Sequence, residues 1–140
     1  MDDGSRSAEL TIARPSLDAI IAHARETAPA ECCGLLLGGR DQIVEAVRTR
    51  NIAGDASRFV VDPKDHIDGR RKARRRGLDV VGFYHSHPGS PADPSATDLA
   101  EASYPDHFYL IVSLAGAAPD VRLFRLDEGN FLPLPFVTVP

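Results

Sequence analysis

Two histidines, His85 and His87, stand two positions apart at the end of an apolar run that has the composition of a buried strand. Because alternate residues of a strand point to the same face, their imidazoles would converge on one point. Asp98 falls in the first turn of a predicted helix, and the loop before it is long enough to fold that turn back toward the strand end. Two imidazoles and a carboxylate with an open fourth position indicate a catalytic zinc site, since structural zinc normally has four protein ligands. These donors suit zinc, although iron or cobalt could substitute.

Each part of this pattern also has an ordinary explanation. Two histidines in a strand are often only partly exposed residues, and Ser95 and Asp98 have the spacing of a capping box at a helix start. Both features together, separated by a turn-rich loop directly after a buried strand, are much rarer by chance. The sequence therefore favours a metal site formed by His85, His87 and Asp98.

A hydrolytic metal site also needs a general base, for which Glu31 is the candidate. Glu31 directly precedes the apolar run 32–37. A carboxylate at the start of a buried strand is either a solvated strand end or a group placed at a site. Spacing alone favours the solvated end.

Composition limits the class of protein. The chain has 140 residues, 43% of them hydrophobic and 26% charged, which predicts one globular domain over 1–140 with its core at about 8–131. A net charge of −4 gives no reason to expect nucleic acid as a partner. No apolar run approaches the roughly 20 residues of a membrane span, and the first residues are too polar for a signal peptide. We expect a cytoplasmic protein without a membrane partner, and its oligomeric state stays open.

Hydropathy and turn signals predict an α/β (α+β) domain with a mixed sheet, because helices and strands are mixed without strict alternation. Segments 32–37 and 43–49 have the pattern of a hairpin. Prolines 133 and 135 place the last strand at a sheet edge. The expected helices are 15–28, 63–76 and 95–103, and the expected strands are 10–13, 32–37, 43–49, 58–61, 78–85, 107–114, 121–126 and 131–139.

The motif from His85 to Asp98 has the form H-S-H-P-x6-S-x-x-D, and Glu31 lies upstream of it. This arrangement resembles the JAMM (MPN+, or JAB) zinc metalloprotease family, most of all its small stand-alone bacterial members. The resemblance covers about 10–131. It implies a cytidine-deaminase-like JAB/MPN domain, in which a mixed, curved sheet is flanked by helices.

The resemblance also implies a mechanism. One zinc per chain would be held by His85, His87 and Asp98, with a water in the fourth position. Glu31 would deprotonate that water and pass the proton to the departing amine. Ser95 would donate its hydroxyl to the oxyanion, a use that competes with capping the helix. The implied substrates are peptide or isopeptide bonds after the C-terminal Gly-Gly of ubiquitin-like or sulfur-carrier (ThiS/MoaD-like) proteins.

Two other functions stay open. A RadC-like, DNA-repair-associated protein shows a similar motif, but the negative net charge and the lack of a helix-hairpin-helix-like region argue against it. A non-catalytic scaffold of the same fold is disfavoured by the complete set of candidate ligands. The eukaryotic members of the family that the chain resembles select polyubiquitin linkages with two insertions. The corresponding segments here, 58–76 and 115–120, are short, so the resemblance does not imply elaborate linkage selection.

Residues outside the motif have simpler interpretations. Segment 70–76 carries six cations, which form either a solvated helix face, the slightly favoured interpretation, or a docking surface for an acidic partner. Cys32 and Cys33 would point to opposite sides of a strand and are expected to be buried small hydrophobes. Tyr84 is expected to face away from the candidate ligands and to pack. Three further histidines are expected to be structural or surface residues: His23, His66 and His107.

Overall fold

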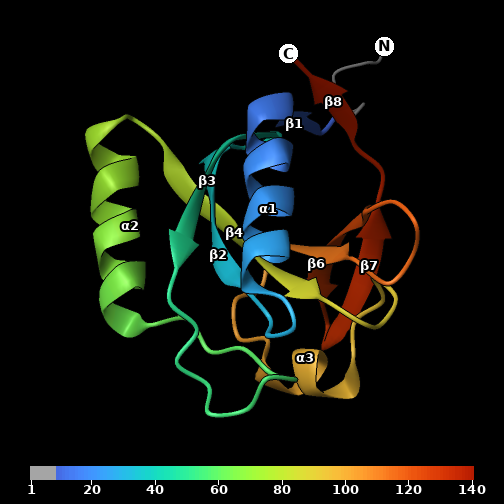
Figure 1. Cartoon of the computed structure of the whole chain (residues 1–140). Helices are drawn as coiled ribbons and strands as arrows, with labels where there is room; N and C mark the ends of the chain where they lie inside the picture. Colours follow the sequence, from blue (N-terminus) through green and yellow to red (C-terminus); the bar gives the residue numbers. More distant parts are fainter. Residues whose placement is uncertain (1–8) are drawn as a thin grey trace.

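An eight-stranded mixed β-sheet is the framework of the protein, and the computed structural model describes residues 9–140 (Figure 1). The strand order is β7-β6-β5-β4-β2-β3-β1-β8. Three pairs are parallel (β4 with β5, β1 with β3, and β1 with β8), and the others are antiparallel, which confirms the mixed sheet. The strands are β1 (Thr11–Ala13), β2 (Cys33–Gly39), β3 (Gln42–Thr49), β4 (Asp79–His87), β5 (Phe108–Ser113), β6 (Asp120–Asp127), β7 (Asn130–Leu134) and β8 (Val137–Val139).

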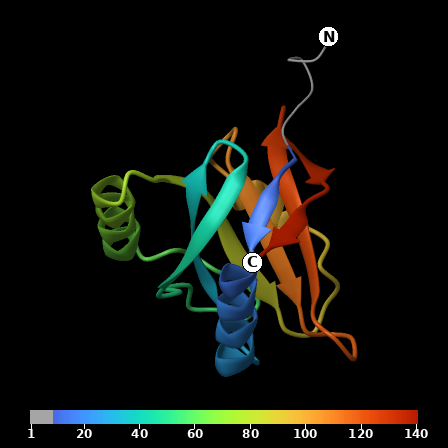
Figure 2. The same ribbon diagram turned by 90° about the horizontal axis from the view of Figure 1, so that it is seen from above.

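The sheet is strongly curved. Only Pro135 and Phe136 separate β7 from β8, yet these strands lie at opposite ends of the strand order. Because each residue spans at most about 3.6 Å of chain, the two edges of the sheet must curl toward each other. Figure 2 shows the result, with C-terminal strands in red beside β1 in blue.

The prediction of a single strand over 131–139 was therefore wrong, because this segment forms two strands. The prediction that it lies at a sheet edge is confirmed, since β7 and β8 form the two edges. Pro133 lies in the edge strand β7. This strand ends before Pro135, which has no N–H to donate to a neighbouring strand. Beyond the break, β8 covers the other edge by pairing with β1.

Helices cover both faces of the sheet. On one face α1 (Arg14–Thr27) packs Leu17, Ile20 and Ala24 into a core cluster with Leu36 of β2. The other face carries α2 (Pro63–Arg75) and, near the end of β4, α3 (Ala96–Glu101).

Local sequence explains where α2 begins, ends and crosses the sheet. Its first turn has Pro63 and an Asp62 carboxylate that accepts a hydrogen bond from the Lys64 N–H. The helix ends before Gly77, which adopts a positive φ of 71°. A Cβ at Gly69 would collide with Leu35 of β2, so this glycine permits the close approach of α2 to the sheet.

A strand expected over 58–61 does not form, and Val61 makes only an isolated bridge with Asn51. The Asn51 side chain explains the difference. Its amide donates to the Arg58 carbonyl and accepts from the Val60 N–H, so these backbone groups are bound by a side chain rather than by a neighbouring strand.

The expected orientations of Cys32, Cys33 and Tyr84 are confirmed. Both cysteines are buried, and because they are consecutive in an extended segment they face opposite sides of the sheet. Tyr84 is buried in the α1 cluster, where its hydroxyl lies 2.7 Å from His23 Nδ1. Burial raises the pKa of Tyr84 and lowers that of His23, so this pair is neutral and structural. No helix within residues 9–140 is both long enough and apolar enough to span a membrane.

Candidate metal centre

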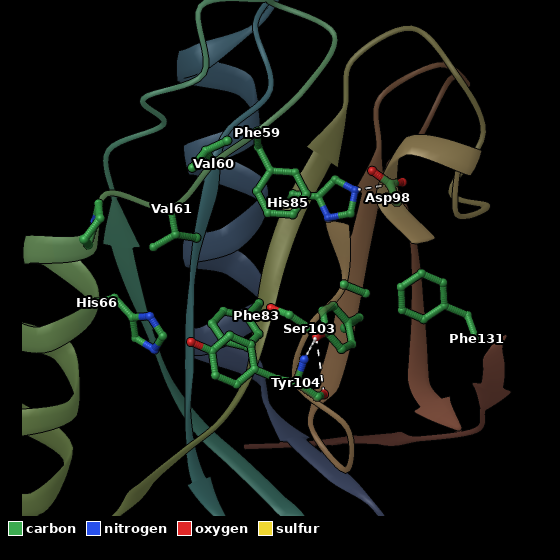
Figure 3. Close-up of a pocket in the computed structure, with 13 residues that line it drawn as sticks. Phe59, Val60, Val61, His66, Phe83, His85, Asp98, Ser103, Tyr104 and Phe131 are labelled. Carbon is green, nitrogen blue, oxygen red and sulfur yellow. Dashed lines mark hydrogen bonds and ion pairs between the residues drawn. The ribbon is translucent and has the colours of Figure 1, made fainter. Parts of the chain in front are cut away.

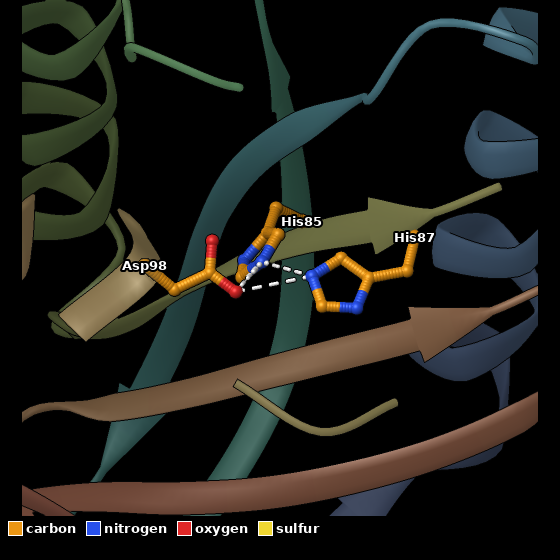
Figure 4. A group of neighbouring side chains, drawn as sticks. All are labelled: His85, His87 and Asp98. Atoms are coloured by element: carbon orange, nitrogen blue, oxygen red, sulfur yellow. Dashed lines mark hydrogen bonds and ion pairs between the residues drawn. The ribbon is translucent and has the colours of Figure 1, made fainter. Parts of the chain in front are cut away.

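The end of β4 brings two imidazoles to one point, as the period of two predicts. His85 and His87 both face the side of the sheet that carries α2 and α3, and their Nε2 atoms are 3.2 Å apart. Asp98, in the first turn of α3, places its Oδ2 atom 3.2 Å from His85 Nε2 and 3.0 Å from His87 Nε2 (Figure 4). The three side chains thus converge, and all are largely buried.

The dimensions of this triangle fit a zinc ion. A tetrahedral centre with bonds of about 2.0–2.1 Å separates its ligand atoms by about 3.3 Å. The three separations here are 3.0–3.2 Å. Two neutral nitrogen donors and one carboxylate oxygen are also a donor set that zinc prefers. The residues present therefore fit one zinc ion without rearrangement of the chain.

Neighbouring groups fix how each imidazole is presented. His87 Nδ1 lies 2.7 Å from the Pro91 carbonyl, so it carries the proton and leaves Nε2 as a lone-pair donor. The ring of Phe59 stacks on His85, with centroids 4.2 Å apart and planes inclined by 20°. These contacts hold the donor atoms toward Asp98.

Charge at the centre is concentrated on Asp98. Without a metal, burial would raise the pKa of its carboxyl, but hydrogen bonds from the two imidazoles, when protonated on Nε2, hold that pKa well below its usual range. Burial lowers the pKa of His85. Burial also acts to lower the pKa of His87, but the Asp98 hydrogen bond and the Pro91 carbonyl reverse this, and the net shift is upward. The centre therefore presents one anionic oxygen among imidazoles.

The Ser95–Asp98 capping box forms at the start of α3. It also orients the Asp98 carboxylate toward the two histidines. Ser95 N–H donates to Asp98 Oδ2, and Asp98 N–H donates to Ser95 Oγ, both at 2.9 Å. The box thus orients the carboxylate that meets the histidines. Ser95 Oγ only accepts in this cap, so its own hydrogen stays available, and the expected competition between capping and donation does not arise.

Glu31 is a buried group of the site rather than the solvated strand end that spacing favoured. Cys33 pairs with His85, and the ladder continues through a 3.1 Å hydrogen bond from Ser86 N–H to the Cys32 carbonyl. Continuing this antiparallel pairing two residues before Cys33 places Glu31 opposite His87. Glu31 and His87 therefore face the same side of the sheet. Glu31 is only 7% exposed.

The Glu31 carboxyl has an unusual environment. Its Oε1 atom has no hydrogen-bond partner among the described residues. Burial raises its pKa to about 7, and the negative charge of Asp98 adds to the shift while His87 opposes it. A carboxyl that exchanges its proton near neutral pH can act as a general base and then as a general acid.

Sequence reasoning missed Asn51 and Phe59. Asn51 Nδ2 donates to the carbonyls of Glu31 and Arg58, and its Oδ1 accepts from the N–H groups of Ala53 and Val60, at 2.9–3.0 Å. One side chain thus joins the backbone of Glu31 to the segment that carries Phe59. Neither residue belongs to a recognisable motif, and an asparagine before a Gly-Asp turn normally indicates only a loop.

The basic surface of α2 is partly structural. Lys72 and Arg76 both pair with Glu45 of β3 and so hold the helix on the sheet. Among residues 9–140, no ion pair involves Arg71, Arg74 or Arg75, which lie on the exposed side of the helix. This agrees with the favoured interpretation, a solvated helix face.

Comparisons with known proteins identify the family and relatives of this chain. The model of a family described as prokaryotic homologs of the JAB domain matches residues 13–127. The chain is 40% identical over 124 residues to a desampylase of Haloferax volcanii, which covers 84% of this chain and 86% of the relative. It is 30% identical over 123 residues to a CysO-cysteine peptidase of Mycobacterium tuberculosis, which covers 86% of this chain and 84% of the relative.

A solved structure supports the expected fold. The JAB1/MPN domain protein from Archaeoglobus fulgidus superimposes with a TM-score of 0.65 and covers 96% of this chain and all of its own. Because the two sequences are only 19% identical, this match bears on the fold alone. It confirms the expected JAB/MPN architecture of a curved mixed sheet flanked by helices.

Proposed function

The chain belongs to the prokaryotic JAB family of hydrolytic enzymes, and on that premise we propose that it is a zinc-dependent peptidase or isopeptidase. Its substrates are bonds after the C-terminal Gly-Gly of ubiquitin-like or sulfur-carrier proteins. The observation that carries this proposal is the triangle of His85, His87 and Asp98 with the buried, unpartnered Glu31 on the same face of the sheet.

The triangle is the metal-binding part of the site. His85 Nε2, His87 Nε2 and Asp98 Oδ2 would hold one zinc ion and leave one position open. A zinc ion held by these residues would supply Lewis-acid chemistry to the scissile carbonyl and to the attacking water. The Pro91 carbonyl keeps His87 in the tautomer that this role requires.

Glu31 and Ser95 do the proton chemistry. Glu31 takes a proton from the attacking water as the new C–O bond forms, and returns it to the nitrogen as the C–N bond breaks. Burial raises the pKa of this carboxyl and so favours its uptake of the proton. Ser95 uses its remaining hydroxyl hydrogen to stabilise the oxyanion. Such acid–base catalysis is worth roughly 10²–10⁴-fold in rate.

The burial of the site supports a substrate with a slender tail. His85 and His87 are 2% and 4% exposed, so a chain with side chains on both sides of the scissile bond would be obstructed. A Gly-Gly tail has no Cβ and lets its backbone approach closely. The relatives' names, desampylase and CysO-cysteine peptidase, support a small carrier protein as the partner.

The test is intact-mass analysis of the ubiquitin-like sulfur carriers encoded in the same genome, each extended by one amino acid beyond Gly-Gly. Loss of that amino acid with the wild type and not with Glu31→Gln supports the proposal. The variant must still bind one zinc per chain, which excludes unfolding as the cause. Equal cleavage by Glu31→Gln, or no cleavage of any carrier or isopeptide conjugate, contradicts it.

A further inference from the structure

A pocket of about 360 Å³ adjoins the candidate metal centre and has no role in the mechanism above (Figure 3). His85 and Asp98 form one end of its lining. From there it extends toward Phe83 and Tyr104, and residues of segment 59–63 and of β7 complete its walls. The pocket is therefore continuous with the place where the scissile bond must lie.

Aromatic rings form most of the walls. The chain has six phenylalanines and three tyrosines, and five of these nine residues line this one pocket: Phe59, Phe83, Tyr104, Tyr109 and Phe131. The Phe83 ring centroid lies 5.0 Å from that of Tyr104 and 5.7 Å from that of Tyr109, and Tyr109 and Phe131 are 5.1 Å apart. Because these rings support one another, the walls are preformed.

Two polar side chains of these walls, Tyr109 and His66, already have hydrogen-bond partners. The Tyr109 hydroxyl donates to the Tyr104 carbonyl (3.3 Å) and accepts from the Tyr104 N–H (3.1 Å), so this residue presents only its ring. His66 Nε2 accepts from Arg70 Nε at 2.9 Å, and burial and the charge of Arg70 lower the pKa of His66. The walls thus carry no charge of their own beyond Asp98.

A flanking charge disfavours cationic occupants. Arg70 lies 5.7 Å above the Tyr104 ring and disfavours a second cation. An uncharged hydrocarbon group is the chemistry that these walls bind best.

The position of the pocket decides which part of the substrate can enter. The two glycines before the scissile bond have no side chains, and the next side chain upstream is two residues away, about 7 Å along an extended chain. In contrast, the released amine carries its hydrocarbon chain directly beside the scissile bond. The end of the pocket at His85 and Asp98 adjoins the metal centre, so a hydrocarbon chain that starts beside the scissile bond is within its reach.

We propose that this aromatic pocket binds the uncharged hydrocarbon chain of the leaving group. Two sources share this chemistry: the side chain of a single amino acid joined to Gly-Gly, and the stem of a lysine in an isopeptide bond. This inference rests on the proposed function and adds a preference for the group joined to the Gly-Gly tail.

The first test compares leaving groups on one cleaved carrier. Tails that end Gly-Gly-Leu or Gly-Gly-Phe should be cleaved with kcat/KM roughly 10- to 100-fold above Gly-Gly-Gly, the gain expected from burying one apolar side chain. Gly-Gly-Asp should be cleaved no faster than Gly-Gly-Gly, because a carboxylate loses its hydration between apolar walls. Isopeptides of lysine and of the shorter diaminopropionate distinguish the sources, since a bound lysine stem makes the lysine isopeptide the faster of the two.

Substitutions test the pocket itself. Ala102→Phe fills it and should remove the preference for Leu and Phe while leaving Gly-Gly-Gly cleavage within about twofold. Ala19→Phe, on the exposed side of α1 across the sheet, is the matched control and should keep the preference. Should Ala102→Phe not fold, Phe131→Ala removes a wall and should also reduce the preference.

A binding measurement makes the test independent of turnover. In the Glu31→Gln protein, leucinamide and phenylalaninamide should shift the NMR signals of Val61 and Ala102, whereas glycinamide should not. Equal kcat/KM for all uncharged tails would contradict the proposal that the pocket binds the leaving group. A Val61 shift that persists in Ala102→Phe would contradict it as well. No cleavage of any tail would instead contradict the proposed function. The NMR shifts alone would then show whether the pocket binds hydrocarbon groups.

Discussion

Glu31→Gln should abolish turnover and yet stabilise the metal-free protein at neutral pH. The Glu31 carboxyl is buried, has an unpartnered oxygen, and has its pKa raised from 4.5 to about 7. Between these two values the native state holds a proton that the unfolded chain has released. The free energy of unfolding therefore falls as pH rises through this window and levels off above about pH 7.

The magnitude follows from the size of the shift. At 1.36 kcal/mol per pKa unit, the wild-type Glu31 carboxylate costs about 3 kcal/mol above pH 7 compared with pH 4.5. Glutamine has nearly the same shape and does not titrate. The difference in stability between the variant and the wild type should thus grow by about 3 kcal/mol, in favour of the variant, between about pH 4.5 and pH 8.

The assay is urea denaturation of both proteins in a metal chelator, across that pH range. Other titrating groups are common to both proteins, so the difference between their curves reports Glu31 together with its coupling to His87. Parallel curves, with a constant difference at every pH, would refute the assignment of Glu31 as a buried carboxyl with a raised pKa.

Three further predictions concern the support of the site. Asn51→Ala removes four hydrogen bonds and should cost about 2 kcal/mol or more of unfolding free energy, with kcat reduced and one zinc per chain retained; unchanged kcat would show that Asn51 does not position Glu31. Phe59→Ala removes the ring stacked on His85 and should weaken zinc affinity in a chelator competition, whereas an unaltered affinity would contradict a supporting role. Tyr84→Phe leaves His23 without its hydroxyl partner and should cost about 1–3 kcal/mol in urea denaturation without affecting kcat, and a fall in kcat would contradict its purely structural role.

The convergence of His85 and His87 was predictable because it depends only on the period of a strand. Asp98 was predictable because the loop before it is long enough to return to the strand end, and the motif resemblance supported both. Local signals also placed α1, α2 and the β2–β3 hairpin, since Pro63 and Gly77 mark the ends of α2.

Burial of Glu31 was not predictable from spacing, because it depends on the register between β2 and β4. The same limit applies to Asn51, whose four partners lie up to 20 residues away in sequence. The division of segment 131–139 was missed because alternation along a chain does not reveal that two short strands close opposite edges of one curved sheet. The missed features are thus those fixed by tertiary pairing.

The most direct test of the central claim is a zinc titration of the metal-free enzyme, with cleavage of a Gly-Gly-extended carrier followed by intact mass. The site predicts no cleavage before zinc is added, a rise in rate that is linear in zinc, and a sharp end point at one zinc per chain. The same titration of Asp98→Ala should show no end point at this stoichiometry. Full cleavage in the continued presence of a strong chelator, or none at saturating zinc, would contradict a metal centre formed by His85, His87 and Asp98.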